Sequence, residues 1–93
     1  MSDVAIEEFI DLFMNVKSTL LARELLSLMF TLDEIDDIAG RVNIVKALLD
    51  RKLPQREISS EYGVSIAKVT RGSNALKIIS PDLKAYLREA LLN

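Results

Sequence analysis

The stretch Gln55-Arg-Glu-Ile-Ser-Ser-Glu-Tyr-Gly63-Val-Ser-Ile-Ala-Lys-Val-Thr-Arg71 decides the fold, because it has the pattern of two short helices joined by a tight turn. Gly63 supplies the backbone position at which a turn favours glycine. Ser65 is a suitable N-cap for the second helix. The apolar positions that two such helices would bury against each other are Ile58, Tyr62, Val64, Ile66 and Val69. Ser59 is small and falls where the helices come closest, so the stretch predicts a helix-turn-helix.

The outward positions of this motif carry hydrogen-bond donors and positive charge. They are Arg56, Ser65, Lys68, Thr70, Arg71, Asn74 and Lys77. Such side chains suit the phosphates and base edges of a duplex. Gly72 stands where most motifs of this kind have a branched apolar residue. The segment Arg71-Gly-Ser-Asn74 is therefore expected to have a specific role.

The composition predicts one small all-α domain. The 93 residues are 49% hydrophobic, and apolar residues recur at helical rather than strand-like spacing. Cysteine and histidine are absent, which excludes disulfides, thiol chemistry and the usual zinc sites, and we expect no enzyme activity and no cofactor. No apolar run approaches the roughly 20 residues of a membrane span. The first residues lack the basic start of a signal peptide, so a cytoplasmic location without membrane contact is expected.

The formal net charge of −2 is divided unevenly along the chain. Residues 1–40 carry nine acidic and two basic side chains, whereas residues 41–93 carry ten basic and five acidic ones. The basic excess falls between Arg41 and Lys77. It could be an ordinary solvated face, but its position over the helix-turn-helix favours contact with phosphate.

The N-terminal third is apolar around most of its circumference. Helices are expected near residues 3–18 and 22–29, and a helix on the surface of a small domain buries a face of only a little over 100°. A compact bundle could bury these side chains internally. A chain this short offers few partners for them, however, so we expect residues 1–50 to form the core of a homodimer. The apolar residues concerned are Ile6, Phe9, Ile10, Leu12, Phe13, Met14, Val16, Leu20, Leu21, Leu25, Leu26, Leu28, Met29 and Phe30.

The remaining helices have clear start signals. Thr31-Leu-Asp-Glu34 is a capping box that opens a helix reaching about Asp50. Pro54 cannot continue that helix and suits the first turn of the next one. Ser80-Pro-Asp82 begins a final amphipathic helix over residues 81–92. The sequence thus predicts six helices in one domain, with the helix-turn-helix over residues 55–79.

The chain resembles the tryptophan repressor family from about Leu25 to Leu92. The resemblance rests on Leu25-Leu-Ser-Leu-Met-Phe-Thr31, Gly40-Arg-Val42, Gln55-Arg-Glu57 and, above all, Ile66-Ala-Lys-Val-Thr-Arg-Gly-Ser-Asn-Ala-Leu-Lys77. The first 20 or so residues are too generic to count. The resemblance implies an intertwined, all-helical homodimer, in agreement with the apolar excess noted above.

The resemblance also implies L-tryptophan as corepressor. At the matching positions, Arg41 and Arg71 would sandwich the indole ring, since guanidinium planes stack on aromatic faces. Arg71 would also hold the carboxylate, together with Thr31. The backbone carbonyls of Leu28 and Phe30 would accept the ammonium group, while Val45 and Gly72 would line the wall. Ala75 stands where the family usually has a serine, which removes one hydrogen bond to the ligand.

A DNA surface is implied at several further positions. Gln55, Thr70, Asn74 and Lys77 match phosphate-contacting residues, Arg56 matches an arginine that can read guanine, and the backbone of Ile66 and Ala67 would face base edges. Two positions on this surface depart from the family pattern, since Ser59 replaces a lysine and Lys68 a threonine. We therefore expect an altered operator sequence and salt dependence. Ser65 also replaces a glycine in the turn, which is expected to stiffen the second helix.

These observations predict a repressor of tryptophan biosynthesis or uptake genes that binds operator DNA with L-tryptophan as corepressor. Two alternatives stay open: a helix-turn-helix regulator that responds to another ligand or none, and a dimeric interaction protein that has lost DNA binding. Arg71 could also be only a surface ion-pair partner, and Arg41 could pair with Asp37 or with a dimer mate. Asp36 and Asp37 are interpreted as a solvated helix face.

Overall fold

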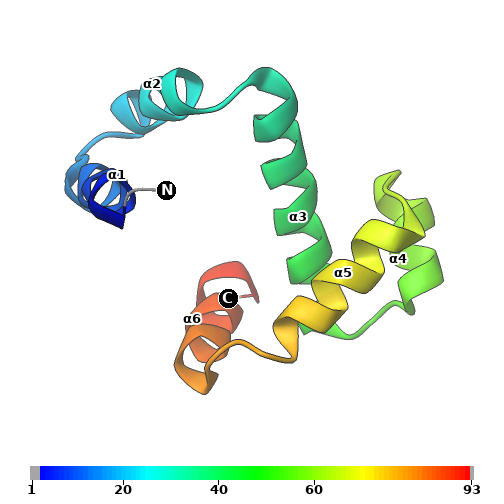
Figure 1. Cartoon of the computed structure of the whole chain (residues 1–93). Coiled ribbons are helices and arrows are strands. Elements are labelled where there is room, and N and C mark those ends of the chain that lie inside the picture. Colours follow the sequence, from blue (N-terminus) through cyan, green and yellow to red (C-terminus); the bar gives the residue numbers. More distant parts are fainter. Residues whose placement is uncertain (1–2, 93) are drawn as a thin grey trace. The chain divides into compact units, whose positions relative to one another are not determined.

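The computed structural model describes residues 3–92, which form six α-helices and no strand (Figure 1). The all-α prediction and the number of helices are confirmed. No helix in this range is long and apolar enough to cross a membrane. The helices are α1 (Asp3–Asn15), α2 (Thr19–Met29), α3 (Leu32–Asp50), α4 (Gln55–Tyr62), α5 (Ile66–Leu76) and α6 (Pro81–Leu92).

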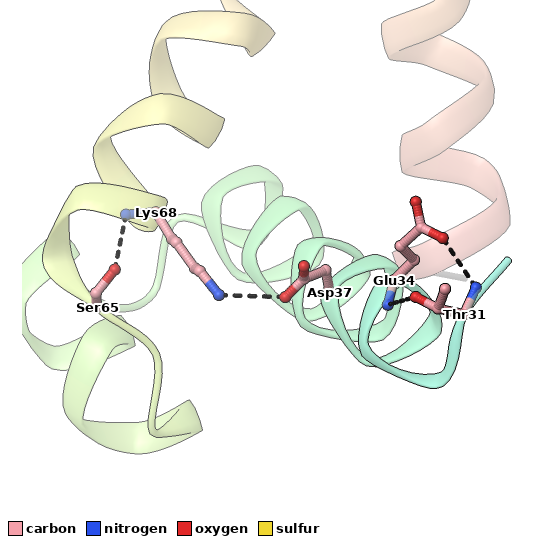
Figure 2. A network of polar contacts seen from close by, with 5 residues as sticks. All are labelled: Thr31, Glu34, Asp37, Ser65 and Lys68. Atoms are coloured by element: carbon pink, nitrogen blue, oxygen red, sulfur yellow. Dashed lines mark hydrogen bonds and ion pairs between the residues drawn. The ribbon is translucent and has the colours of Figure 1, made fainter.

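Side-chain caps fix where four of these helices begin, and one of these caps is Ser65 at the start of α5. Thr31 and Glu34 form the predicted capping box: the Thr31 N–H donates to Glu34 Oε1 at 2.8 Å, and the Glu34 N–H donates to Thr31 Oγ1 at 3.1 Å (Figure 2). Ser80 accepts from the Leu83 N–H at 3.1 Å, as expected for an N-cap before Pro81. Ser18 was not predicted as a cap, yet its hydroxyl accepts from the Leu21 N–H at 3.0 Å. Because of this cap, α2 begins at Thr19, and the predicted ranges 3–18 and 22–29 were wrong at that boundary.

The chain divides into two compact units, the first ending at Ile35 and the second beginning at Asp36. In the first unit, the ring of Phe9 makes edge contacts with Phe13 and Phe30, with centroids 4.8 and 5.9 Å apart. Neither α1 nor α2 contains a fully buried residue. The large apolar side chains that are exposed on them are Val4, Ile6, Ile10, Leu12, Met14, Leu20, Leu21, Leu28 and Met29.

The second unit has its own small core. Ile44 and Ala47 of α3 pack with Ile58 of α4 and Val69 of α5. Leu48, Leu53 and Val64 pack around them. Figure 1 shows α5 crossing α3 with α4 beside it. This core holds the helix pair α4 and α5 against the second half of α3.

Gly72 explains how closely α5 approaches α3. It is buried, and a Cβ atom at this position would lie only 2.8 Å from Cγ2 of Ile44 and 3.5 Å from Cδ1 of Leu48. Real Cβ atoms essentially never come within 3.0 Å of such a neighbour. Position 72 therefore requires glycine instead of the usual branched apolar residue, because the packing of α5 on α3 leaves no space for a side chain.

Candidate functional site

The turn between α4 and α5 has the geometry predicted for a helix-turn-helix. Gly63 is left-handed, with φ 63° and ψ 33°, and its N–H donates to the Ser59 carbonyl. The Ser59 hydroxyl donates to the Val64 carbonyl at 2.6 Å, and Ser65 Oγ accepts from the Lys68 N–H at 3.2 Å. Both serines therefore hold the turn in place.

The buried positions of the motif were predicted only in part. Ile58 and Val69 are fully buried, and Val64 is half-buried. Tyr62 and Ile66, however, are 41% and 49% exposed, so their predicted burial was wrong. Tyr62 ends α4 and Ile66 begins α5. They stand at the two ends of the turn, where neither helix continues far enough to cover them.

The predicted DNA-contacting side chains lie mostly on the exposed surface of α4 and α5. Ser59 is half-buried, and its hydroxyl is already used inside the turn. Thr70 Oγ1 donates to Gln55 Oε1 at 3.3 Å, which ties the start of α4 to the middle of α5. The other predicted positions, all exposed, are Arg56, Ser65, Ile66, Ala67, Lys68, Asn74 and Lys77.

A cavity of about 390 Å³ lies between α3 and α5. The α3 residues that line it recur at helical spacing. The rest of the lining comes from Val64 in the turn and from Lys68 and Arg71 of α5. The lining residues are Asp36, Asp37, Gly40, Arg41, Ile44, Val64, Lys68 and Arg71. The structure thus brings together the two arginines predicted to hold the ligand.

Arg41 is directed against α5 close to Arg71. Its Nη1 atom lies 3.6 Å from the position that a Cβ atom would take at Gly72. Within residues 3–92, the ion pairs are Lys52 with Asp50 and Lys68 with Asp37, so neither arginine has a carboxylate partner. The interpretation of Arg41 as a salt-bridge partner of Asp37 was therefore wrong.

Asp37 forms the ion pair with Lys68 instead. The Lys68 Nζ and Asp37 Oδ1 atoms are 3.3 Å apart (Figure 2). Asp36 and Asp37 are both exposed, as a solvated helix face requires, and they also line the cavity. The sequence contained a signal for this cavity lining, because positions 37, 40, 41 and 44 recur at helical spacing and share one face of α3.

The other predicted ligand residues lie outside this cavity lining. Val45 is half-buried in α3, and Ala75 is exposed near the end of α5. Leu28, Phe30 and Thr31 belong to the first unit, at the C-terminal end of α2 and just beyond it. Backbone carbonyls at such a helix end lack intrahelical partners. The grouping of all eight residues into one site stays a prediction.

Asp37→Asn is expected to tighten binding of duplex DNA several-fold at low salt. The substitution frees Lys68 and removes a negative charge near the exposed basic side chains of α4 and α5, which strengthens their attraction to phosphate. Stability should change by less than about 1 kcal/mol, since both partners of this ion pair are more than half exposed. Fluorescence anisotropy at two salt concentrations would measure the affinity, with Glu89→Gln of α6 as the control that removes the same charge elsewhere. Unchanged or weaker binding by Asp37→Asn would show that the pair does not restrain Lys68.

The fold and the site define a helix-turn-helix protein of the DNA-binding regulator class. The chain belongs to the Trp repressor family, because the family model described as Trp repressor protein matches residues 5–91. The predicted membership is confirmed, and with it the absence of enzyme activity, since this family consists of non-enzymatic transcription regulators. The family also implies a helix-turn-helix and DNA binding.

Individual relatives are similar over most of their length. The chain is 41% identical to the Trp operon repressor homolog of Chlamydia trachomatis serovar D, over 91% of this chain and 90% of that protein. It is 44% identical to the homolog of Chlamydia caviae, over 87% and 80% of the two chains. The corresponding values for Mannheimia succiniciproducens are 48%, 72% and 66%.

Proposed function

We propose that this protein is a cytoplasmic, homodimeric repressor that binds operator DNA and uses L-tryptophan as corepressor to silence tryptophan biosynthesis or uptake genes. The observation that carries this proposal is the cavity between α3 and α5, with Arg41 and Arg71 in its lining and neither of them paired with a carboxylate of residues 3–92. Two unpaired guanidinium groups beside a cavity suit an aromatic amino acid, since they can stack on its ring and bind its carboxylate.

Each predicted ligand residue has a physical role in this proposal. Arg41 and Arg71 hold the indole between their guanidinium planes, and Arg71 with Thr31 binds the carboxylate. The carbonyls of Leu28 and Phe30 accept the ammonium protons. Val45 and Gly72 provide the wall, and the absence of a side chain at Gly72 lets α5 lie close to α3. Ala75 offers no hydrogen bond, which weakens the hold on the ammonium group.

Dimerisation is supported by the apolar surface of the first unit. The exposed fractions of Met14, Leu20 and Leu28 are 77%, 69% and 78%. Exposed apolar area on this scale is uncommon on a monomeric protein and marks an interface. A symmetric pair of chains would cover these side chains and present two copies of α5 to one duplex.

The two α5 helices would enter successive major grooves, about 34 Å apart. Gln55, Thr70, Asn74 and Lys77 would fix the register on phosphates, while Arg56 reads guanine. Tryptophan would favour this geometry only by binding it more tightly than other arrangements of α5. The ligand thereby sets the affinity for DNA.

The test is equilibrium binding to a palindromic trp-operator duplex at one fixed salt concentration, with and without saturating L-tryptophan. We expect tryptophan to tighten binding at least tenfold, which corresponds to about 1.4 kcal/mol of coupling. Equal binding in both conditions would leave DNA binding intact and remove tryptophan as the effector.

A second candidate is a DNA-binding regulator with another effector. Two observations favour it: Ala75 lacks the family hydroxyl, and Asp36 and Asp37 give the cavity two carboxylates. A cavity with both signs of charge also suits a ligand with a second cationic group. Indoles and basic amino acids should therefore be compared with tryptophan in the same binding assay.

A further inference from the structure

A second cavity in the same unit is lined by positive charge. It has a volume of about 230 Å³ and is lined by residues from the C-terminal ends of α3 and α5 and from α6. Four of its lining residues are cationic, three are leucines, one is a serine, and none is acidic. They are Leu48, Leu49, Arg51, Ser73, Leu76, Lys77, Lys84 and Arg88.

Most of this charge is not neutralised within the chain. Arg51, Lys77 and Lys84 take part in neither of the two ion pairs found in residues 3–92. Asp50, the acidic residue next to Arg51, pairs with Lys52 at 3.9 Å. Arg88 donates from Nη1 to the Leu49 carbonyl at 2.9 Å, which ties α6 to the end of α3. The fold thus holds like charges around one cavity, an arrangement that an anion would stabilise.

The backbone of Arg51 is a second, independent observation. Arg51 has φ 60°, and it is the one residue other than glycine with a positive φ in the described range. Its N–H closes the end of α3 by donating to the Ala47 carbonyl at 3.2 Å. Glycine takes this left-handed conformation without steric cost, whereas other residues take it at a cost in free energy. A left-handed residue commonly ends a helix, but it is usually glycine, so an arginine at this position is unusual.

We propose that this cavity binds a phosphate group. The planar guanidinium of Arg51 can bind two phosphate oxygens at once, and Lys77 and Lys84 add point charges. The Ser73 hydroxyl adds a hydrogen-bond donor, and the leucines keep the site partly dry, which strengthens its electrostatic attraction. The site shares no residue with the proposed tryptophan site.

Two sources could supply this phosphate chemistry. One is a phosphodiester of bound DNA next to the sequence that α5 reads, since Lys77 lies both in the cavity lining and among the predicted phosphate contacts. The other is a free phosphate or a small phosphorylated molecule. The two sources are distinguished by measuring DNA binding and phosphate binding separately.

The test uses a double variant, Arg51→Gly with Lys84→Gln. The glycine removes the guanidinium and gives the left-handed position the residue that prefers it, so the variant should fold. Lys17→Gln with Lys46→Gln is the matched control, because it removes the same charge from exposed positions outside the cavity lining and leaves the Lys52–Asp50 pair intact. Thermal unfolding would verify that both variants are folded.

The first arm follows duplex affinity against salt concentration. One lost phosphate contact makes the negative slope of log affinity against log salt shallower by about 0.9. A loss of that size in the cavity variant but not in the control would support a phosphodiester. The second arm titrates inorganic phosphate at constant ionic strength and follows the amide NMR signals of residues lining the cavity. Saturable shifts in the wild type that vanish in the cavity variant, with an unchanged salt slope, would support a free phosphate ligand.

The proposal is overturned if phosphate causes no saturable shift and the two double variants have the same salt slope. Neither arm requires tryptophan, and the phosphate titration requires no DNA. Failure of the phosphate site is therefore distinguishable from failure of the proposed corepressor function.

Discussion

Gly72→Ala is expected to lower the free energy of unfolding by about 1–3 kcal/mol, the usual cost of adding a methyl group to a packed core. Alanine is the better helix former by about 1 kcal/mol, so propensity alone predicts the opposite sign. The steric effect should win because the new Cβ atom would lie 2.8 Å from Cγ2 of Ile44, whose side chain is only 1% exposed. A branched and buried residue cannot move this methyl group without leaving its preferred rotamer. To relieve the clash, α5 must shift away from α3, so DNA and ligand affinity should fall as well.

Gly40→Ala is the matched control for this prediction. Gly40 also lies inside a helix, but a Cβ atom there would be 3.9 Å from Cγ1 of Val64, an ordinary contact. This variant should gain stability, by up to about 1 kcal/mol. Urea unfolding of both variants at the same protein concentration would measure the difference, because the stability of an oligomer depends on concentration. Equal stabilisation by both alanines would mean that Gly72 is not a packing requirement.

Local signals predicted much of this fold correctly. The Thr31–Glu34 capping box, the Ser65 cap and the left-handed Gly63 occur as the sequence indicates, because each depends on atoms within a few residues of chain. Boundaries without a clear local signal were less certain. Ser18 competes with several neighbouring polar residues as a possible start for α2, and its cap was missed.

Contacts between distant positions were harder to predict. The Lys68–Asp37 pair joins residues 31 positions apart, and no periodicity in either segment specifies it. The clash that requires Gly72 is likewise a property of the α3–α5 crossing. From sequence alone, Gly72 appeared as a departure from a pattern and, through the resemblance, as part of the ligand-site wall, but its packing against Ile44 was not predicted. Gly40, Ile44 and Val64 did not appear as cavity residues.

The candidate ligand site was likewise predicted only in part. Arg41 and Arg71 were named from a resemblance and lie in the lining of one cavity. Physical reasoning on the sequence offered Asp37 only as a possible ion-pair partner of Arg41 and placed neither Asp36 nor Asp37 in a ligand site. The cavity proposed to bind phosphate had no sequence signal beyond Lys77, since Arg51, Lys77 and Lys84 come from three separate segments and line one cavity only because α6 packs at the end of α3.

Arg71→Ala is expected to weaken L-tryptophan binding by roughly 30-fold or more, about 2 kcal/mol at least. The substitution removes a stacking cation, worth about 0.5–2 kcal/mol, and a charge-assisted hydrogen bond to the carboxylate, worth about 1.5–3 kcal/mol. Isothermal titration calorimetry of the wild type and the variant would measure the change. Because the proposed corepression depends on ligand binding, any gain in DNA affinity that tryptophan causes in the wild type should disappear in the variant at moderate tryptophan concentrations.

Two further variants show which property of Arg71 accounts for the loss of tryptophan affinity in Arg71→Ala. Arg71→Lys keeps the charge but loses the planar fork, so its affinity should fall between those of the wild type and Arg71→Ala. Arg56→Ala removes an exposed arginine of α4 that does not line the cavity, and it should weaken DNA binding while tryptophan affinity is unchanged. If Arg71→Ala and the wild type bound tryptophan equally, the indole could not be stacked on Arg71. The cavity between α3 and α5 would then need a different ligand, and its carboxylates would indicate one with a second cationic group.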